Sequence, residues 1–415
     1  MFTPQGLFMS KVAVIGAGAA GLIAAYFAAK NGNDVTAFEK NEKSGKKIYI
    51  TGKGRCNVTH DCTPAEFLEN VVSNSKFLTG AIYSFSPEKC VQFFEDGGLK
   101  LKLERGGRYF PVSDKASDVT RCLENYCKDV GVTFKFGEKV EKIGILHSTM
   151  SRIITAKGEY KFDNVIVCTG GLSYPSTGST GDGYDFARAA GHKIIPLKQG
   201  LCGLNLKGDF YKGLQGLTLK NVNLSVLNGE KLIKSFFGEM LFTHFGVSGP
   251  IVLSASSLIN RQDLKQIKLV LDLKPALNDE QLDRRLLRDF EAYKNKSISN
   301  CLKELLPAAL IAEVLKISGI KPETQVNSVT KAQRLSLLTS VKNFDMIVAS
   351  LRDFSEAIIT CGGVDVREIN PKTMESKLVK GLYFCGEVLD IDAFTGGYNL
   401  QIAFATGYAA GNSIK

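Results

Sequence analysis

A glycine-rich turn near the start of the chain carries the first residues that could do chemistry. Gly16, Gly18 and Gly21 follow a short aliphatic run and lead into a helical stretch, Leu22 to Lys30, and the next expected strand ends at Glu39, 23 residues beyond Gly16. In such a unit the first glycine permits a tight turn, the second lets the backbone approach a pyrophosphate, and the third allows close packing of the helix on the strand. The acidic residue can accept hydrogen bonds from a ribose diol. The spacing therefore predicts a dinucleotide site, without distinguishing NAD from FAD.

Glycines recur at the ends of two further expected strands. Gly170 and Gly171 follow the buried run Asn164 to Cys168, and the segment Gly381 to Glu387 ends in a carboxylate that could bind a polyol. A later turn, Gly396-Gly397, precedes a helix whose first amides could stabilise negative charge on a reduced flavin ring. Three strand ends of this kind around one ligand indicate a long cofactor.

His244, inside the string LFTHFGVSGP, is the best candidate for acid–base catalysis. It precedes a glycine-rich turn, and histidine titrates near neutrality. Tyr398 and Tyr174 are weaker candidates for the same catalytic role. A lone histidine between two phenylalanines is more often structural, so that alternative stays open.

Cys56 and Cys62 offer a different chemistry, thiol–disulfide exchange with a flavin. Such an enzyme needs a thiolate against the flavin and a second thiol in reach, and the spacing CNVTHDC does not indicate one, so we expect Cys56 to pack against the cofactor. The ten cysteines run from Cys56 to Cys385 without a CxxC motif, and the four histidines are scattered. We therefore expect no metal site and a reducing, cytoplasmic environment.

The elements that must position these residues divide the chain into three regions. Strand and helix signals alternate at first and return near the end, which predicts a discontinuous nucleotide-binding domain over 9–193 and 356–415. Alternating strands with glycine punctuation predict an antiparallel barrel that binds the substrate, over 194–275 and 331–355. Helical periodicity predicts an insertion over 276–330.

The composition is that of a globular protein, since 44% of the residues are hydrophobic and 23% are charged, and the length of 415 residues predicts two or three domains. The 52 Lys+Arg against 42 Asp+Glu leave a net charge of +10, which attracts anions without choosing between nucleotides, nucleic acid and lipid. The apolar run from Val12 to Ala29 could pass for a membrane span. Its glycines lie where a strand turns into a helix, however, so we expect no membrane segment.

Four strings resemble a family of bacterial FAD flavoproteins, the BaiN/RdsA-like NAD(P)/FAD-dependent oxidoreductases, also described as the aminoacetone oxidase family. They are ITGKGRCNVT (50–59), EMLFTHFGVSGP (239–250), TCGGV (360–364) and GLYFCGEVLDIDAFTGGYNLQIAFATG (381–407). The resemblance covers essentially the whole chain from Met9. It implies a glutathione-reductase-like Rossmann FAD domain, discontinuous in sequence, with an inserted antiparallel β-barrel domain and a small helical subdomain.

The resemblance also implies which residues bind FAD. The pyrophosphate would lie at the first turn, the adenosine ribose at the end of the second strand, and the flavin along the segment from Lys46 to Asn57. The departures from the family, Cys168 and Cys361 at positions of small residues, are conservative. The residues assigned to the cofactor are Gly16, Gly18, Ala19, Ala20, Gly21, Glu39, Lys40, Lys46, Gly52, Arg55, Cys56, Asn57, Val140, Thr169, Gly170, Gly171, Gly386, Glu387, Gly397, Asn399 and Leu400.

These observations predict an FAD-dependent oxidoreductase that transfers a hydride between flavin N5 and a small organic substrate. The family supports two chemistries, oxidation of an amine by O2 and NAD(P)H-dependent reduction of an enone in a steroid. A second GxGxxG unit is absent from the sequence, so O2 or a transiently bound NAD(P)H would be the redox partner. The alternative is an RNA-binding or RNA-modifying flavoprotein, motivated by a pI of about 9.0. No RNA-binding signature accompanies that charge, so we expect neither a stable nucleic-acid partner nor a membrane partner.

Overall fold

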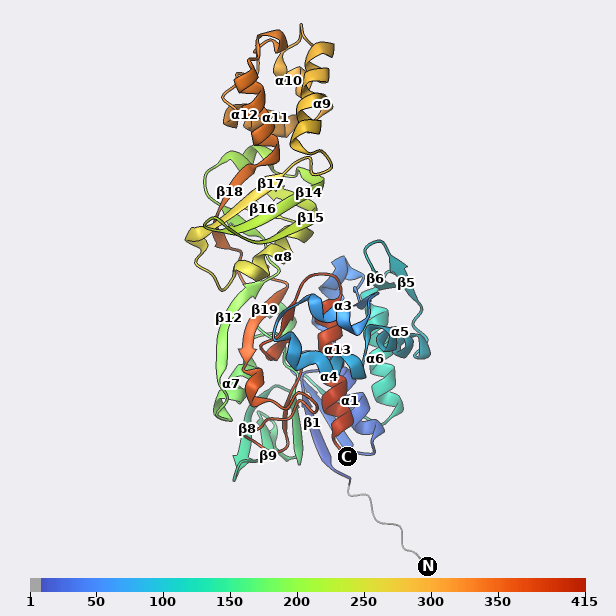
Figure 1. The fold of residues 1–415 in the computed structure, drawn as a ribbon. Helices are drawn as coiled ribbons and strands as arrows, with labels where there is room; N and C mark the ends of the chain where they lie inside the picture. Colours follow the sequence, from blue (N-terminus) through green and yellow to red (C-terminus); the bar gives the residue numbers. More distant parts are fainter. Residues whose placement is uncertain (1–8) are drawn as a thin grey trace, which may run out of the picture. The chain divides into compact units, whose positions relative to one another are not determined.

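The computed structural model describes residues 9–415, which separate into two compact units (Figure 1). Unit 1 contains the described residues up to Gly200 together with Phe354–Lys415, and unit 2 is Leu201–Asp353. Each unit has its own hydrophobic core. Unit 2 is therefore an insertion in the chain of unit 1.

A five-stranded parallel sheet forms the centre of unit 1, in the order β20-β11-β1-β2-β7. The pairing of β1 with β2 and β11 brings Ile15 beside Phe38 on one side and Val167 on the other. Parallel strands are buried on both faces, which explains why aliphatic residues dominate them. The strands are β1 (Lys11–Ile15), β2 (Asp34–Glu39), β7 (Thr133–Phe136), β11 (Asn164–Val167) and β20 (Leu382–Phe384).

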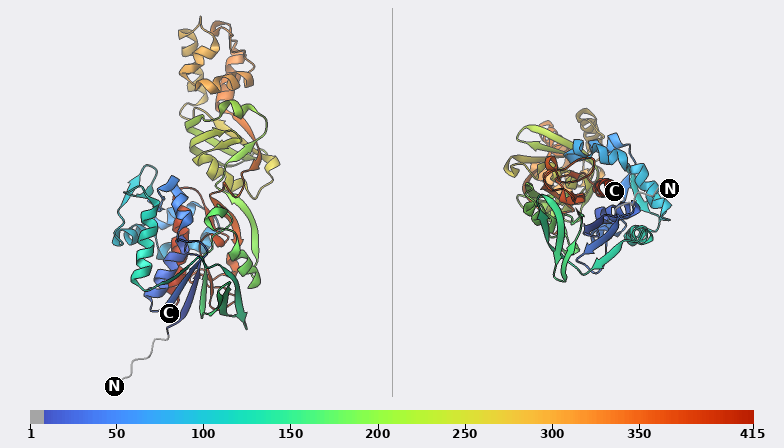
Figure 2. Two further views of the ribbon diagram at one scale, coloured as in Figure 1. Left: turned by 180° about the vertical axis from the view of Figure 1, so that it is seen from behind. Right: turned by 90° about the horizontal axis from the view of Figure 1, so that it is seen from below.

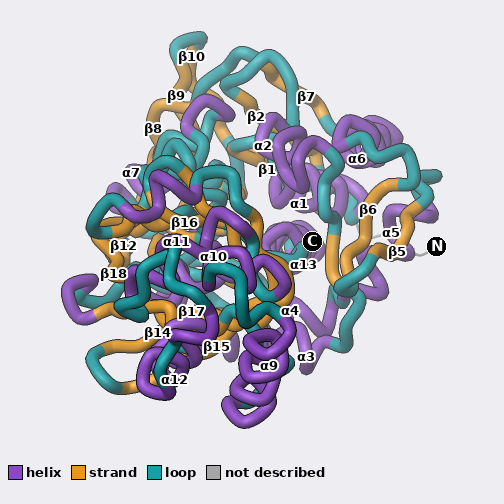
Figure 3. The backbone as a smooth tube through the Cα atoms, turned by 90° about the horizontal axis from the view of Figure 1, so that it is seen from above, coloured by secondary structure: helices purple, strands orange, loops and turns teal. Residues whose placement is uncertain are grey.

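Two helices rich in small residues, α1 (Ala19–Lys30) and α13 (Tyr398–Ser413), pack side by side in unit 1 (Figures 1 and 3). A Cβ at Gly407 would lie 2.4 Å from the carbonyl oxygen of Ala20, and a Cβ at Gly411 would lie 2.3 Å from that of Ala24. The two glycines therefore let the helix backbones approach closely. This contact joins the first helix of the described residues to the last one.

The remaining elements of unit 1 form helices and small antiparallel sheets around the central sheet. Local signals start the helices: α3 begins with Pro64 after a capping box between Thr63 and Glu66, and α5 begins with Pro87 after the cap Ser86. The small sheets are β10-β9-β8, β12-β19, β21-β4 and β3-β6-β5. The bounds are α2 (Lys46–Ile50), α3 (Pro64–Glu69), α4 (Ser75–Ser84), α5 (Pro87–Asp96), α6 (Ala116–Asp129), α7 (Asp182–Ala189), β3 (Thr59–His60), β4 (Val71–Ser73), β5 (Leu101–Glu104), β6 (Arg108–Pro111), β8 (Val140–Leu146), β9 (Thr149–Thr155), β10 (Gly158–Lys161), β12 (Ile194–Gly200), β19 (Ile359–Val364) and β21 (Asp392–Ala393).

The boundary between the units differs from the sequence prediction, which gave residues 194–200 to the barrel. These residues form β12, whose partner is β19, and both strands belong to unit 1. An alternating pattern predicts a strand but not the strand with which it pairs. The boundary therefore lies after Gly200.

Unit 2 contains a closed barrel of six strands in the order β13-β16-β15-β14-β17-β18 (Figure 2). All neighbours are antiparallel, and alternate residues such as Leu224 and Val226 on β14 are fully buried. Helix α8 (Pro250–Ile259) packs against β15. The strands are β13 (Leu204–Leu206), β14 (Thr218–Asn228), β15 (Lys231–Thr243), β16 (Gly246–Ser248), β17 (Ile267–Asp272) and β18 (Phe344–Leu351).

A helical subdomain of unit 2 lies between β17 and β18 in the chain and comprises α9 (Asp279–Ala292), α10 (Ile298–Cys301), α11 (Ala308–Ile317) and α12 (Lys331–Lys342). The sequence analysis assigned residues 331–355 to the barrel. This assignment is wrong for residues 331–342, which form α12. Thr330 and Gln333 form a capping box that starts α12, and the strand begins only at Phe344. The helical subdomain is therefore longer than the sequence pattern indicated.

The predicted fold class, a discontinuous parallel nucleotide-binding sheet with an inserted antiparallel barrel and a small helical subdomain, is confirmed. Within the described part of the chain, no helix is long and apolar enough to span a membrane. The apolar run from Val12 to Ala29 is divided between β1 and α1.

Candidate active site

The glycine-rich turn between β1 and α1 forms a cradle. Gly16 has a φ of 98°, and a Cβ there would lie 2.6 Å from the carbonyl oxygen of Cys168. A Cβ at Gly21 would lie 1.9 Å from the carbonyl oxygen of Gly16, whereas no described atom lies within 4 Å of the Cβ position of Gly18. The protein's own backbone therefore requires the two outer glycines, and the middle one leaves space for a ligand.

The first turn of α1 offers backbone amides to that space. Gly18 is the N-cap residue, and no described side chain caps this helix. The first amides of a helix lack intrahelical acceptors and carry partial positive charge, so those of Ala19 and Ala20 suit an anion. The end of β20 reaches the same turn, because a Cβ at Gly386 would lie 3.0 Å from the Cβ of Ala20.

Glu39 ends β2 with a carboxylate fixed beside this turn. Its Oε2 accepts a hydrogen bond from the backbone N–H of Ala17 at 3.0 Å. Its Oε1 accepts from the backbone N–H and the side-chain amide of Asn41, at 2.9 and 2.7 Å. An ionised carboxylate has about four lone-pair positions, so Glu39 keeps the capacity to accept a further hydrogen bond from a ribose.

Lys40 binds a carboxylate that the sequence did not single out. Its Nζ lies 2.6 Å from Oδ2 of Asp182 and 2.5 Å from Oγ1 of Thr180, and Lys139 approaches the other oxygen of Asp182 at 3.2 Å. Burial acts to raise the pKa of Asp182, but the two lysines outweigh it and hold that pKa below its ordinary value. Val140, assigned to the adenine, follows Lys139 and is buried as the first residue of β8.

The loops after β11 and β20 converge with β19 around Glu387. Its Oε1 accepts hydrogen bonds from the backbone N–H of Thr360 at 2.8 Å and from the hydroxyl of Ser173 at 2.6 Å, and its Oε2 pairs with Nζ of Lys47 at 2.6 Å. A Cβ at Gly171 would lie 2.4 Å from Oγ1 of Thr360, so only glycine fits there. The sequence analysis assigned Gly171 and Glu387 to the cofactor and included Lys47 in the flavin segment from Lys46 to Asn57, but it gave no role to Ser173 or Thr360.

Two buried polar atoms in the assigned segments, Oγ1 of Thr169 and Oδ1 of Asn57, have no hydrogen-bond partner within residues 9–415. Buried polar atoms are nearly always satisfied in folded proteins. Beside Thr169, Gly170 turns the backbone with a φ of 71°. The two unsatisfied atoms, the open position at Gly18 and the uncapped end of α1 together fit a dinucleotide.

The start of α13 meets β3 at a second glycine turn. Gly397 has a φ of 100°, and a Cβ there would lie 2.7 Å from the carbonyl oxygen of Thr59. The side chain of Asn399 binds the protein itself, since it accepts from the N–H of Ala393 at 3.0 Å and donates to the carbonyl of the same residue at 2.9 Å. The backbone amides of Asn399 and Leu400 are therefore the groups left for the expected flavin contact.

The segment after α2 is a strained turn. Lys53 and Cys56 have φ angles of 59° and 61°, in the left-handed region that costs energy for a residue with a side chain. Arg55 is held by protein groups, at 2.8 Å from Glu104 and with its guanidinium 4.1 Å from the ring centre of Phe110. Strain of this kind is common where a loop is shaped for a ligand.

The thiols near this turn are poor nucleophiles. Cys56 is completely buried, which raises the pKa of its thiol to about 12. Burial and then the charges of Glu66 and Asp61 raise the pKa of Cys62 to about 11. All ten cysteines are free, and all lie within the described residues. The structure thus favours packing, rather than thiol exchange, as the role of Cys56.

Two of the three catalytic candidates lie in unit 1. The buried ring of Tyr398 stacks on His60 with 4.7 Å between ring centres, and His60 is hydrogen-bonded through Nδ1 to the carbonyl of Gly396 at 3.0 Å. Burial raises the pKa of Tyr398 and of Tyr174 above the ordinary value, and for Tyr174 the charge of Glu356 adds to it. Both phenols are therefore proton donors rather than bases at neutral pH.

His244, the third candidate, lies in unit 2 at the end of β15, and its side chain is exposed. Its ring meets that of Phe245 edge-on at 5.1 Å, and the guanidinium of Arg352 lies 4.4 Å from the centre of the same phenylalanine ring. A Cβ at Gly203 would lie 2.8 Å from the Phe245 ring, so glycine makes room for this stack. An exposed imidazole beside a cation and an aromatic face is available to a substrate.

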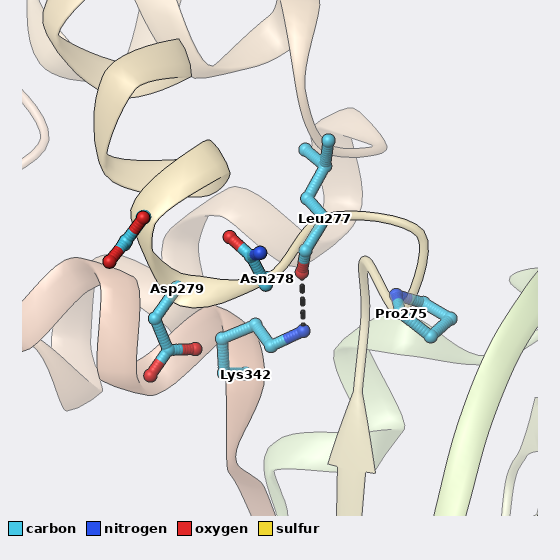
Figure 4. A pocket seen from close by; sticks show the side chains of 6 residues that line it. Pro275, Leu277, Asn278, Asp279 and Lys342 are labelled. Carbon is cyan, nitrogen blue, oxygen red and sulfur yellow. Dashed lines mark hydrogen bonds between the residues drawn. The ribbon is translucent and has the colours of Figure 1, made fainter.

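A separate cavity of about 570 Å³ lies in unit 2 at the start of α9 (Figure 4). The Nζ of Lys342 donates to the carbonyl of Leu277 at 2.7 Å and pairs with Asp272 at 2.6 Å. None of the predicted site residues lines this cavity, so the cavity adds nothing to the candidate site.

The described residues contain no group of three or more His, Cys, Asp or Glu side chains that could hold a metal ion.

The chain is similar to two known enzymes along nearly its whole length. It is 32% identical over 410 residues to the 3-dehydro-bile acid delta(4,6)-reductase of Clostridium scindens. The aligned region covers 98% of this chain and 99% of the relative. It is 31% identical over 408 residues to the ribosomal RNA dihydrouridine synthase of Haemophilus influenzae, with 97% and 98% covered.

Solved structures and family models agree on the fold. The 3-ketosteroid-delta4-(5alpha)-dehydrogenase of Rhodococcus jostii RHA1 aligns with a TM-score of 0.54 over 99% of this chain and 97% of that protein, at 14% identity, which is a likeness of fold. The model of the HI0933-like protein Rossmann domain matches residues 10–413. This chain therefore belongs to the HI0933-like family, and with it to the FAD-dependent oxidoreductases.

Proposed function

We propose that this protein reduces a carbon–carbon double bond conjugated with a carbonyl group, with FAD as its cofactor. The observation that carries the proposal is the full-length similarity to two enzymes whose names describe that chemistry. A delta(4,6)-reductase of a 3-oxo steroid and an enzyme that converts uridine to dihydrouridine both saturate a C=C bond next to a carbonyl. The shared feature is therefore the reaction rather than the substrate.

The residues of unit 1 hold the cofactor in this proposal. The amides of Ala19 and Ala20 bind the diphosphate, Glu39 binds the adenosine ribose, and Glu387 binds the ribityl chain. The amides at the start of α13 face the flavin ring and favour negative charge on it. When bound, FAD supplies the hydride equivalent that the substrate receives.

The protein must also deliver a proton, because adding a hydride to a conjugated double bond leaves an enolate on the substrate. We assign this proton to His244, whose exposed imidazole can donate a proton to a substrate. Tyr398 and Tyr174, which keep their phenolic protons, are the alternative donors. NAD(P)H, bound transiently, is the proposed source of the electrons.

An anaerobic half-reaction tests the proposal. Enzyme whose flavin has been reduced is mixed with a 3-oxo-Δ4,6 steroid, and flavin reoxidation is followed by its absorbance while mass spectrometry checks for a product two hydrogens heavier. Reoxidation with that product is expected. Failure of every enone to reoxidise the flavin, together with bleaching of the oxidised enzyme by a primary amine, would show amine oxidation instead.

A second candidate substrate is a uracil base in ribosomal RNA, favoured by the similarity to the Haemophilus influenzae enzyme and by the net charge of +10. The same reduced enzyme is mixed with unmodified ribosomal RNA, and dihydrouridine is measured after nuclease digestion. Binding to phosphates weakens steeply with salt, so a salt series separates an RNA substrate from adventitious RNA.

A further inference from the structure

Lys47 reaches from α2 into a closed network of hydrogen bonds around Glu387. Its Nζ donates to Oε2 of Glu387 at 2.6 Å and to Oγ of Ser173 at 2.5 Å. The serine hydroxyl then donates its single proton to Oε1 of Glu387 at 2.6 Å. Two of the three N–H donors of Lys47 and the hydroxyl of Ser173 thus have acceptors within this network.

The network ties together segments that are far apart in the chain. Oε1 of Glu387 also accepts from the N–H of Thr360 at 2.8 Å, and Oγ1 of Thr360 accepts from the N–H groups of Leu172 and Ser173 at 2.7 and 3.1 Å. Ser173 and Thr360 are completely buried. The orientation of the Glu387 carboxylate is therefore fixed from two sides by buried groups and from a third by Lys47.

The charge of Glu387 has to be balanced. Its side chain is 20% exposed and that of Lys47 is 24% exposed, so water solvates neither fully. A partly buried carboxylate without its cation is strongly unfavourable. Lys47 supplies that cation.

The neighbouring lysine behaves differently. Lys46, which the sequence analysis assigned to the cofactor, pairs with Glu42 at 3.0 Å, and that glutamate side chain is 71% exposed. Consecutive residues of a helix point about 100° apart, so only one of the two lysines can face Glu387. The contacts select Lys47.

We propose that Lys47 is a positioning residue of the cofactor site, which neutralises Glu387 and, with Ser173, holds its carboxylate ready for the ribityl chain of FAD. This inference rests on the proposed role of Glu387. It gives a specific role to one residue of the segment from Lys46 to Asn57, which the family resemblance placed along the flavin. Its prediction concerns FAD affinity and is independent of the substrate.

The test is FAD binding to the full-length apoprotein, measured as quenching of flavin fluorescence. Lys47→Met should raise the Kd for FAD at least ~10-fold, because it leaves a partly buried carboxylate unpaired. Ser173→Ala should raise it by a smaller factor. In the Glu387→Gln background, Lys47→Met should cost under about 3-fold, since the charge it balances is gone. The matched control is Lys89→Met, a substitution of an exposed lysine on α5.

Two further readouts separate the possible failures. The Kd for ADP, which lacks the ribityl chain, should change less than about 2-fold in Lys47→Met, and an equal loss for ADP and FAD would overturn the positioning role. Lys47→Met also leaves Glu387 unpaired in the apoprotein, so the thermal midpoint should fall while the protein stays folded at the temperature of the binding assay. An unfolded Lys47→Met apoprotein would make Lys47 a purely structural residue. A wild-type chain that does not bind FAD would instead refute the cofactor site itself, whereas normal FAD affinity in Lys47→Met would refute only this proposal.

Discussion

Two kinds of side chain could support catalysis: the imidazole of His244 by donating a proton, and the thiols of Cys56 and Cys62 by disulfide exchange. The proposed function favours His244. The proposed reaction needs a proton donor, and such a group typically contributes ~10²–10⁴ in rate. The thiols of Cys56 and Cys62 have pKa values of about 12 and about 11, so neither is a thiolate at neutral pH. We predict that His244→Ala keeps FAD but slows the substrate half-reaction at least ~10²-fold, while Cys56→Ser/Cys62→Ser keeps most of the rate. Stopped-flow absorbance of the flavin measures both.

The opposite result for these variants would change the proposed mechanism. If the double cysteine variant lost the half-reaction and His244→Ala kept it, the enzyme would use dithiol chemistry and the proposed proton donor would be wrong. Retention of FAD in each variant, read from the visible spectrum, is the control that the loss is chemical.

His192 gives a prediction about stability rather than catalysis. Its buried ring lies 3.0 Å from Oε2 of Glu368 through Nδ1 and 2.7 Å from Oγ of Ser376 through Nε2. That hydroxyl already accepts hydrogen bonds from two backbone N–H groups. It therefore donates to the ring, and the ring is neutral with its proton on Nδ1. Burial lowers the pKa of His192 below its ordinary value of 6.5, against the opposing effect of Glu368.

The sign of the pH effect follows from that shift. The folded protein binds the proton less readily than the unfolded chain, so the stabilisation by neutral His192 is complete above pH 6.5 and is lost as the pH falls below it. We expect the thermal midpoint of the wild type to fall more steeply between pH 7 and pH 5 than that of His192→Asn. The exposed His147, as His147→Asn, is the control and should follow the wild type. Parallel curves for all three proteins would contradict the argument.

At the scale of elements, two glycines in the turn into α1 have different roles, since Gly18 is needed for ligand binding and Gly21 for folding. A Cβ at Gly18 meets no described atom within 4 Å, while a Cβ at Gly21 lies 1.9 Å from a carbonyl oxygen of the same turn. Gly18→Val should therefore fold and lose FAD, because the side chain fills the space that the diphosphate needs. Gly21→Val should fail to fold. Circular dichroism and the flavin spectrum of the purified variants measure the two effects, and stoichiometric FAD in Gly18→Val would exclude this turn as the site.

The sequence was sufficient for the elements with local signals. The glycine spacing after β1 and the aliphatic runs of β1 and β11 predicted the nucleotide-binding sheet. The capping box at Thr330 was equally readable and would have identified α12. The pairing of β12 with β19 could not be predicted in this way, because an alternating strand does not specify its partner.

The candidate site shows the same limit. Lys46 and Lys47 are indistinguishable as residue types, and only the direction of each side chain on α2 shows which one meets Glu387. Asp182 and Thr360 were missed because their partners, Lys40 and Glu387, are distant in the chain. Contacts of this kind depend on the tertiary fold.

At the scale of the whole molecule, the two separate cores predict two unfolding events. The groups assigned to FAD all belong to unit 1, whereas the catalytic candidate His244 belongs to unit 2. FAD at about 100 times its Kd should stabilise that unit by about 2.7 kcal/mol and leave unit 2 unchanged. Differential scanning calorimetry of the apoprotein with and without FAD should show one transition that moves to higher temperature and one that stays. A single transition, or an equal shift of both, would contradict the independence of the cores.

The insertion of unit 2 into the chain of unit 1 has a consequence for synthesis on the ribosome. Translation delivers β1, α1 and β11 first, then all of unit 2, and only afterwards β19, β20 and α13. Glu387 and the amides of α13 belong to that last segment, and α13 also covers α1. On the proposed assignment, the nascent polypeptide cannot complete its FAD site until α13 has been synthesised. Translation that stops shortly before α13 should release a chain with an entire barrel and an incomplete site for FAD.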